Sequence, residues 1–359
     1  CFLAGRRATQ SMARPVHTAP KGKRGTRRSS NEPTVADVAG AAGVSPMTVS
    51  RVVNNSPLVS AAMREKELDA IERLGYVPNL ALLHDNPSAT WLSEVLVACL
   101  KQASRNDAQL LVEHCEDRSA IDGLVQHLSS HRIDGVILPP PMCDDASLLI
   151  ALENAGIDKV QLAAGTPVAS ADAVGIDEHA AALAMTRHLL SRGHRRIGFV
   201  VGNAGHSASP LRQKGYEDAI REAGVLAEPD LIAAGDFSYR SGLDAANALL
   251  ARPNRPTAIF ASNDDMAAAV IAAAHQRGLD VPKELSVCGF DDTAMATMIW
   301  PRLTTIHQPI AEIADTATQL LISAVRARAT GEARQPQHKQ LPFTLICRES
   351  DASPVSPVS

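Results

Sequence analysis

The sequence predicts an all-α helix-turn-helix headpiece in its N-terminal part, followed by a larger α/β domain of two lobes. Three observations predict this architecture. With 359 residues and 45% apolar content, the chain is long enough for two or three domains with sizeable cores. Residues 34–54 combine helical periodicity with helix caps. From residue 82 onward, apolar runs of strand length alternate with amphipathic segments of helix length.

Two short helices are predicted within residues 34–54. In the first helix the apolar side chains recur at i, i+3, i+4 and i+7, the spacing of one helix face: Val35, Val38, Ala39 and Ala42. Gly43 ends this helix, because glycine adopts the left-handed backbone of a C-cap without strain. Ser45 is a suitable N-cap for the second helix, and Pro46 takes its first position, where the missing amide hydrogen costs nothing. A third helix is expected from Ser60 to Leu74.

The outer side of the second helix carries small or hydrogen-bonding side chains: Met47, Thr48, Ser50, Arg51 and Asn54. In a helix-turn-helix this second helix enters the DNA major groove, where such side chains suit bases and phosphates. Arg51 is the only Lys or Arg between residues 29 and 63. Its guanidinium can hold a guanine through two hydrogen bonds. Any short amphipathic helix pair also has polar outer positions, so the residues alone leave DNA binding and a plain helical module as equal interpretations.

Charge is distributed unevenly along the chain. The formal net charge is −4, yet residues 1–31 contain eight cations and no acid. This segment is rich in Gly, Ser, Thr, Pro and Arg, so we expect residues 1–32 to form a disordered basic arm that attracts DNA phosphates. The alternative is that part of the arm is upstream sequence without a role. A second disordered segment is expected at residues 350–359.

The region after residue 82 shows the alternation that is typical of parallel sheets flanked by helices. Strands are expected at residues 110–112, 135–138, 159–163, 173–176, 197–201, 257–261 and 285–290. Helices are expected at residues 91–105, 119–131, 144–155, 178–192, 211–223, 239–252, 263–277 and 310–327. So many βα units indicate two lobes. Ligands of such sheets bind beyond the carboxyl ends of the strands, so the loops after the strands are the candidate binding region.

Several functional classes are disfavoured by the composition. No segment approaches the roughly 18 consecutive apolar residues of a membrane helix, and residues 1–5 are too short an apolar run for a secretory signal. We therefore expect a cytoplasmic protein that does not contact a membrane. The six cysteines include no CxxC pair, which argues against a disulfide framework and against a zinc site. No metal ion or cofactor is predicted.

An enzymatic role has little support in the sequence. The chain contains no GxSxG, GxxxxGK[ST] or HExxH motif, and no GxGxxG after a predicted strand. His127 and His131 lie four residues apart on a predicted helix but lack further ligands, so a solvated face is the better interpretation. The acidic pairs at residues 144–145, 264–265 and 291–292 each open a helix, where the helix dipole favours carboxylates. We therefore predict no catalytic residue.

The run TVADVAGAAGVSPMTVSRVVN at residues 34–54, with SPLVS and LGYVPN after it, resembles the headpiece of LacI-family bacterial repressors. The resemblance implies that Pro46, Met47 and Arg51 read bases. It implies phosphate contacts for Thr34, Ser45, Thr48, Ser50 and Asn54. Because the ring of Pro46 donates no hydrogen bond, sequence choice is implied to rest on Met47 and Arg51. The implied partners are double-stranded operator DNA and a second copy of the chain, since one headpiece reads only a half-site.

The larger region resembles the effector domain of the same family, a pair of lobes like those of periplasmic sugar-binding proteins. The segments SRGHRRIGFV, LRQKGY, FASNDDMA and LTTIHQP carry this resemblance in order. It implies that Arg212 and Asp264 bind a sugar or sugar-acid effector, with Phe237 as an aromatic floor. A guanidinium and a carboxylate across a cleft can each hold two hydroxyl groups. An N-cap role is the alternative for Asp264. Further effector contacts are implied at Asp85, Ser88 and Asp292.

The resemblance also implies a hinge helix between the headpiece and the first strand of the effector domain. In this chain LGYVPN runs directly into residues 80–88, so that roughly 15 residues are absent relative to a helix plus a strand. Either residues 79–84 form the strand themselves, or the first lobe lacks one. In the family the hinge helix wedges a Leu into the minor groove and transmits the effector state. We therefore expect effector binding to survive better than tight, effector-controlled operator binding.

Four segments are predicted in total: a basic arm at 1–32, a helix-turn-helix domain at 33–80, a two-lobed effector and dimerisation domain at 81–349, and a tail at 350–359. The predicted function is a sequence-specific DNA-binding regulator, in the first instance a repressor, of carbohydrate-metabolism genes under the control of a small sugar effector. The alternative is a sugar-binding protein whose operator binding is impaired because the hinge is absent. A periplasmic binding protein shares the lobes but has no use for residues 33–76.

Overall fold

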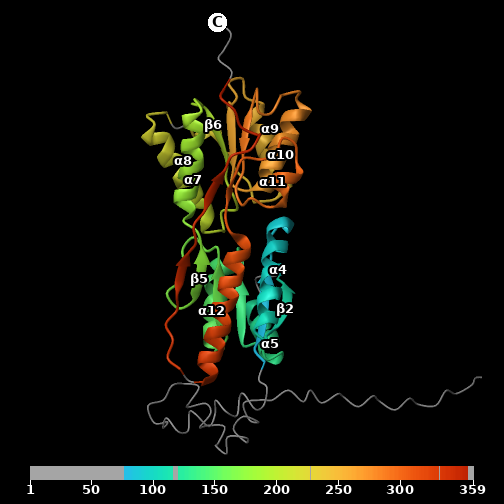
Figure 1. The fold of residues 1–359 in the computed structure, drawn as a ribbon, viewed down its shortest axis with the longest axis vertical. Coiled ribbons are helices and arrows are strands. Elements are labelled where there is room, and N and C mark those ends of the chain that lie inside the picture. The colour runs from blue at the N-terminus through green and yellow to red at the C-terminus, as the bar shows by residue number, and fades with distance from the viewer. Residues whose placement is uncertain (1–76, 116–119, 227, 331, 355–359) are drawn as a thin grey trace, which may run out of the picture.

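The computed structural model describes residues 77–115, 120–226, 228–330 and 332–354. They form two α/β lobes stacked end to end, with lobe 1 below lobe 2 in Figure 1. The predicted basic arm, the headpiece helices and all eight candidate DNA contacts lie outside the described residues. Among the described helices, none combines the length and the apolar character that a membrane span requires.

Lobe 1 contains a six-stranded parallel sheet with the strand order β11-β5-β4-β3-β1-β2. Its strands are β1 (Asn79–His84), β2 (Gln109–His114), β3 (Gly135–Leu138), β4 (Asp158–Leu162), β5 (Asp172–Gly175) and β11 (His338–Gln340). Its helices are α4 (Ala89–Arg105), α5 (Ile121–Ser130), α6 (Ala146–Asn154) and α12 (Ile310–Thr330), with the 3-10 turn η2 (Met142–Asp144) before α6. Helices α4 and α12 pack on one face of the sheet, and α5 and α6 pack on the other.

Strand β1 shows why both faces of this sheet are covered. Leu80 and Leu82 pack into the core under α4 and α12, whereas Ala81 and Leu83 pack into the core under α5 and α6. All four side chains are fully buried. Since successive residues of a strand point to opposite faces, an uninterrupted apolar run forms a strand that is buried on both sides.

Lobe 2 contains a four-stranded parallel sheet with the order β7-β6-β8-β9. Its strands are β6 (Ile197–Val200), β7 (Ile232–Ala233), β8 (Ala258–Ala261) and β9 (Ser286–Cys288). Its helices are α7 (Glu178–Ser191), α8 (Ala208–Glu222), α9 (Tyr239–Leu250), α10 (Asp264–Gln276) and the short α11 (Ala294–Met298), with the 3-10 turn η3 (Pro229–Leu231) before β7. The α7–α8 pair and the α9–α10 pair lie on opposite sides of this sheet (Figure 1).

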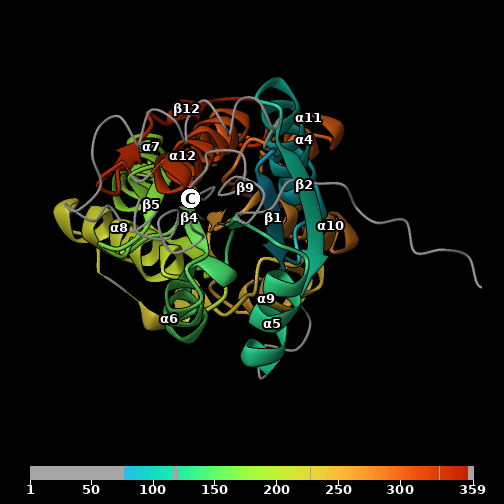
Figure 2. The same ribbon diagram turned by 90° about the horizontal axis from the view of Figure 1, so that it is seen from below.

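Three chain segments connect the lobes. The chain enters lobe 2 after β5, returns to lobe 1 between β10 (Thr305–His307) and α12, and leaves again between β11 and β12 (Thr344–Ile346). Strands β10 and β12 pair antiparallel, so two of these crossings lie side by side. Viewed along the long axis, the two lobes overlie each other (Figure 2). Each lobe is therefore assembled from separated parts of the sequence.

Every strand and helix predicted after residue 82 is present, to within a few residues at its ends. Residues 79–84 form β1, which is the first of the two alternatives that the sequence left open. The short strands β7, β10, β11 and β12, the short helix α11 and the two 3-10 turns were not predicted. None of these strands is longer than three residues, which is too short for an alternating pattern to be visible in the sequence.

Two of the predicted boundaries differ from the structure. The first strand of lobe 1 begins at Asn79, whereas the effector domain was expected to begin at residue 81. The tail predicted at 350–359 is wrong for its first residues, because Ser350 and Asp351 are buried. Asp351 accepts a hydrogen bond from Thr304 Oγ1 at 2.5 Å and lies 2.8 Å from His188 Nε2. These contacts fasten the C-terminal segment to lobe 2.

Candidate functional site

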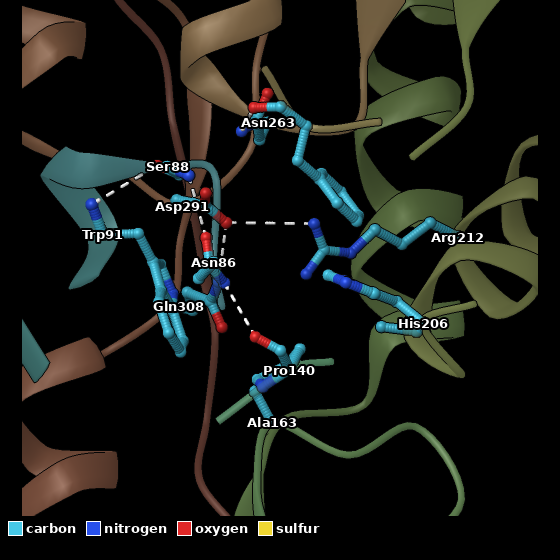
Figure 3. A pocket seen from close by; sticks show the side chains of 12 residues that line it. Asn86, Ser88, Trp91, Pro140, Ala163, His206, Arg212, Asn263, Asp291 and Gln308 are labelled. Carbon is cyan, nitrogen blue, oxygen red and sulfur yellow. Dashed lines mark hydrogen bonds and ion pairs between the residues drawn. The ribbon is translucent and has the colours of Figure 1, made fainter. Parts of the chain in front are cut away.

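A cavity of about 390 Å³, including its open mouth, lies between the two lobes. Most of this space is open to solvent: the enclosed part measures only about 40 Å³, well below the range of about 300–1,000 Å³ that is typical of ligand pockets, so a sugar-sized ligand requires the lobes to part. Its lining residues follow the carboxyl ends of strands in both sheets or begin the next helix, where open α/β sheets bind ligands. They are Asn86, Ser88, Trp91, Pro140 and Ala163 from lobe 1, His206, Ala208, Arg212, Phe237, Asn263 and Asp291 from lobe 2, and Gln308 from a crossing segment (Figure 3).

Arg212, on α8, is the central charged residue of the wall. Its Nε donates to Glu178 Oε2 at 2.7 Å, and its Nη1 donates to the Ser262 carbonyl at 2.6 Å. Its guanidinium carbon lies over the Phe290 ring, 3.7 Å from the ring centroid. Burial lowers the pKa of Arg212, but the carboxylates of Glu178 and Asp291 outweigh burial and raise that pKa above its ordinary value. The guanidinium is thus held charged and in one orientation.

Asp291 faces Arg212 across the cavity (Figure 3), with 3.8 Å between Asp291 Oδ1 and Arg212 Nη1. Burial raises the pKa of Asp291 well above its ordinary value, although Arg212 acts in the opposite direction. Gln308 Nε2 donates to Asp291 Oδ1 at 2.6 Å. This bond orients the Gln308 amide, and its Oε1 atom is buried without a hydrogen-bond partner among the described residues. An unpaired buried acceptor on a cavity wall is available to a ligand donor.

The aromatic side of the cavity is formed by Phe237 and Trp91, one from each lobe. The His206 ring stacks on Phe237 with 5.0 Å between the ring centroids. The backbone of Phe237 has φ 74°, a left-handed conformation that is uncommon for a bulky residue and recurs at functional sites. Gly202 makes room for this ring, since a Cβ atom at that position would meet the Phe237 ring at 2.0 Å.

Three polar side chains complete the wall while capping local structure. Asn263 is the N-cap of α10: its Oδ1 accepts from the Met266 amide at 2.9 Å, and its Nδ2 donates to the Phe237 carbonyl at 2.9 Å. Ser88 is the N-cap of α4, and its hydroxyl donates to Asp265 Oδ2 of lobe 2 at 2.5 Å. Asn86 accepts from the Ser88 amide at 2.9 Å. The backbone is thus fixed around the cavity by the same residues that line it.

The structure brings three of the six predicted effector contacts to the cavity, namely Ser88, Arg212 and Phe237. It places the other three elsewhere. Asp264 is buried and turned away: its carboxylate accepts from Thr305 Oγ1 at 2.7 Å and from the Thr293 amide at 2.8 Å. It therefore holds β10 and the loop before α11 together. The alternative N-cap role is also incorrect, because Asn263 caps α10.

Asp292 and Asp85 also lie off the cavity wall. Asp292 accepts from Arg348 Nη2 at 2.5 Å and lies 3.1 Å from His307 Nδ1. Asp85 Oδ1 lies 4.0 Å from His114 Nε2. Both acidic side chains therefore face neighbouring basic groups rather than the space between the lobes.

The candidate loops after the predicted strands included Asn263 and Asp291, but the sequence reasoning selected the next residue, Asp264 or Asp292, as the contact in each loop. A usable signal existed for both. Asn is a preferred N-cap, and Asn263 immediately precedes the α10 run. Asp291 is the first polar residue after the apolar run at 285–290, so it leaves the strand at its carboxyl end. Gln308 lies within the LTTIHQP segment that carried the resemblance, but its spacing alone gave no reason to select it.

Comparisons with known proteins assign both the N-terminal region and the two lobes to known families. Residues 34–79 match the family model described as bacterial regulatory proteins of the lacI family, and residues 186–350 match a periplasmic binding protein-like domain. The HTH-type transcriptional regulator DegA of Bacillus subtilis (strain 168) is 33% identical over 338 residues, which cover 88% of this chain and 97% of the relative. The HTH-type transcriptional regulator GalR of Escherichia coli (strain K12) is 32% identical, with 89% and 96% covered.

Solved structures show the same architecture. The transcriptional regulator CelR in complex with cellobiose superimposes with a TM-score of 0.70 at 31% identity, covering 89% of this chain and 99% of that one. The lac repressor dimer bound to operator and an anti-inducer gives a TM-score of 0.66 at 26% identity, covering 89% and 99%.

A helix-turn-helix headpiece followed by two α/β lobes around a ligand cavity defines a DNA-binding transcription regulator of the periplasmic-binding-protein-like fold. The chain belongs to the LacI family of bacterial regulatory proteins. The predicted family, fold class and regulator function are confirmed. This family consists of DNA-binding regulators rather than enzymes.

Proposed function

We propose that this protein represses carbohydrate-metabolism genes by binding operator DNA as a homodimer, under the control of a small sugar-type effector held between its lobes. The observation that carries the proposal is the Arg212–Asp291 pair in a small interlobe cavity, in a chain whose residues 34–79 match the lacI headpiece. A regulator of this kind acts in the cytoplasm, where the bacterial chromosome lies.

The cavity chemistry suits a polyhydroxylated ligand. A hydroxyl group both donates and accepts, so it can satisfy the Arg212 donors and the Gln308 acceptor at once. Phe237 and Trp91 supply apolar faces against which the C–H side of a sugar ring packs. The cellobiose bound to CelR and the ribose bound to a LacI family transcriptional regulator from Enterococcus faecium are ligands of this chemical class.

The DNA contacts are assigned through the headpiece resemblance. Arg51 and Met47, with Pro46 beside them, are proposed to read base edges in the major groove. The proposed phosphate contacts are Thr34, Ser45, Thr48, Ser50 and Asn54. Because this module carries few cations, a large share of its specificity is expected to come from direct base contacts.

The homodimer is proposed to form through one side of both lobes. Helices α4 and α11 lie on the same side in Figures 1 and 2. Exposed apolar side chains occur on or beside these helices, and their exposed fractions are 49% for Val97, 45% for Leu100, 82% for Met298 and 76% for Trp300. Apolar side chains of this size gain free energy when a second copy covers them. The lac repressor, which shares this fold, is a dimer on its operator.

The hinge is proposed to be absent. The headpiece model ends at residue 79, and strand β1 begins at Asn79, which leaves no residues for a helix between the two. A headpiece tethered on so short a connection lacks the element that wedges the minor groove in relatives. We therefore expect half-site recognition to persist while operator affinity and its response to effector are reduced.

A thermal-shift screen of the full chain against sugars and sugar acids tests the effector proposal. A ligand that binds only the folded state raises Tm. The matched control is Arg212→Lys, which keeps a cation beside Glu178 but loses the planar fork, and we expect it to lose most of the shift. The proposal is contradicted if no sugar or sugar acid changes Tm, or if Arg212→Lys responds as strongly as the native chain.

A further inference from the structure

The cavity wall has little capacity to bind an anion, although it contains an arginine. Among the lining residues Arg212 is the only arginine or lysine. Its Nε is hydrogen-bonded to Glu178 at 2.7 Å, and Asp291 lies 3.8 Å from its Nη1. The side chains of all three residues are almost completely buried. The guanidinium charge is thus opposed from two sides by carboxyl groups of the protein itself.

Arg212 contributes one positive charge to this cluster, and Glu178 and Asp291 contribute two carboxyl groups. With Asp291 ionised, the two carboxylates exceed the single guanidinium charge, and with Asp291 protonated the cluster is neutral. Asp264 is a further buried carboxyl group near Asp291, and it adds no positive charge whether it is protonated or ionised. An anionic ligand would have to give up its hydration without net Coulomb attraction in return.

The orientation of Gln308 strengthens this conclusion. Its Nε2 is committed to Asp291 at 2.6 Å, so the amide presents its buried Oε1 as a free acceptor. A hydroxyl hydrogen of a ligand can satisfy Oε1, whereas a carboxylate or a phosphate dianion placed at this point would bring only further acceptors, so a charged ligand could satisfy Oε1 only through one of its remaining hydroxyl groups. Leaving a buried acceptor unpaired lowers affinity.

From these contacts we infer that the cavity selects an uncharged sugar and rejects the corresponding sugar acid or sugar phosphate. This inference rests on the proposed function, since it names the chemical class of ligand for the same site. Glu178 is a positioning residue in this selection, because it acts through Arg212 and does not line the cavity.

The test compares each neutral sugar with a charged derivative of the same ring, and the sugar acids are the decisive arm because they add a charge with little change in size. Isothermal titration of the full chain at pH 7.5 uses glucose with glucuronate and glucose 6-phosphate, galactose with galacturonate, and ribose with ribose 5-phosphate. We expect one neutral sugar to bind, with its charged counterparts weaker by about tenfold or more, equivalent to about 1.4 kcal/mol. A charged member that binds more tightly than its neutral partner overturns the inference and leaves the effector proposal standing. Binding by none of them overturns both.

Two variants separate the charge effect from folding. Glu178→Gln keeps an acceptor for Arg212 Nε but removes a negative charge, so the ratio of neutral to charged affinity should fall about threefold or more. Glu222→Gln is the matched control, because Glu222 pairs with Arg187 at an exposed position. An equal ratio in both variants contradicts the role given to the charge of Glu178. The comparison of ligands on the native chain does not depend on either variant.

Discussion

Ser207 of lobe 2, which precedes the cavity-lining Ala208, and Asp144 of lobe 1 are joined by two hydrogen bonds between the lobes. The Ser207 hydroxyl donates to Asp144 Oδ1 at 2.6 Å, and the Ser207 amide donates to Asp144 Oδ2 at 2.9 Å. The same hydroxyl accepts from the Gly165 amide of lobe 1 at 2.7 Å. On another side of the cavity Ser88 is bonded to Asp265 of lobe 2. The lobes are therefore fastened in a closed arrangement by polar contacts on both sides of the ligand space.

Ser207→Ala is expected to weaken effector binding by about three- to tenfold, because about 1 kcal/mol of closure energy is lost with the hydroxyl. Titration calorimetry with the sugar identified by screening measures this change. Ser323→Ala is the matched control, since the Ser323 hydroxyl is bonded only within α12, to Gln319. Equal dissociation constants for the two variants would show that the Ser207 contacts do not support closure.

Arg212→Ala is expected to lower the free energy of unfolding by about 3 kcal/mol, because it leaves Glu178 and Asp291 buried without a counter-ion. Urea denaturation followed by circular dichroism provides the measurement. Arg240→Ala serves as control: Arg240 pairs with Asp244 at the surface, with 84% of its side chain exposed, and its loss should change stability by no more than about 0.5 kcal/mol. A similar small effect at Arg212 would mean that its ion pairs contribute little to folding.

Asp264 should make stability depend on pH. Burial raises its pKa to about 7, so the folded state binds the proton more tightly than the unfolded state does. Proton binding by Asp264 therefore favours the folded state. This contribution to stability is fully present below the ordinary pKa of about 3.9 and is lost as pH rises through about 7. Relative to Asp264→Asn, which retains an acceptor for Thr305, the native chain should lose stability by roughly 1 kcal/mol per pH unit between pH 5 and 7. Parallel stability curves for the two proteins would exclude this titration.

Trp300→Glu is expected to weaken the homodimer by at least tenfold, because it places a charge where an apolar side chain is proposed to be covered by the second copy. Sedimentation equilibrium of the full chain over a range of concentrations gives the dissociation constant. Ile150→Glu on α6 replaces another exposed apolar residue, outside the proposed interface, and should leave dimerisation unchanged. An unaltered dimer in Trp300→Glu, or loss of the dimer in both variants, would place the interface elsewhere.

The elements of the two lobes were predictable because their signals are local. Apolar runs such as 135–138 and caps such as Ser88 lie within a few residues of the elements they determine. The site was less predictable, since the choice between Asn263 and Asp264 depends on partners far away in the chain. Asp264 is drawn toward Thr293 and Thr305, which lie 29 and 41 residues further on. Strands β10 and β12 likewise exist through their mutual pairing, which joins residues about forty positions apart.

Selection of bound sequences from random double-stranded DNA by the full chain addresses DNA recognition most directly. We predict enrichment of a two-fold-symmetric sequence with a guanine in each half-site, and loss of that enrichment in Arg51→Ala, because Arg51 is proposed to hold a base and a dimer presents two headpieces. Affinity is expected to be modest, since the hinge is proposed to be absent. Recovery of DNA without any common sequence, from a native chain that is folded and dimeric, would contradict its assignment as a sequence-specific operator-binding regulator.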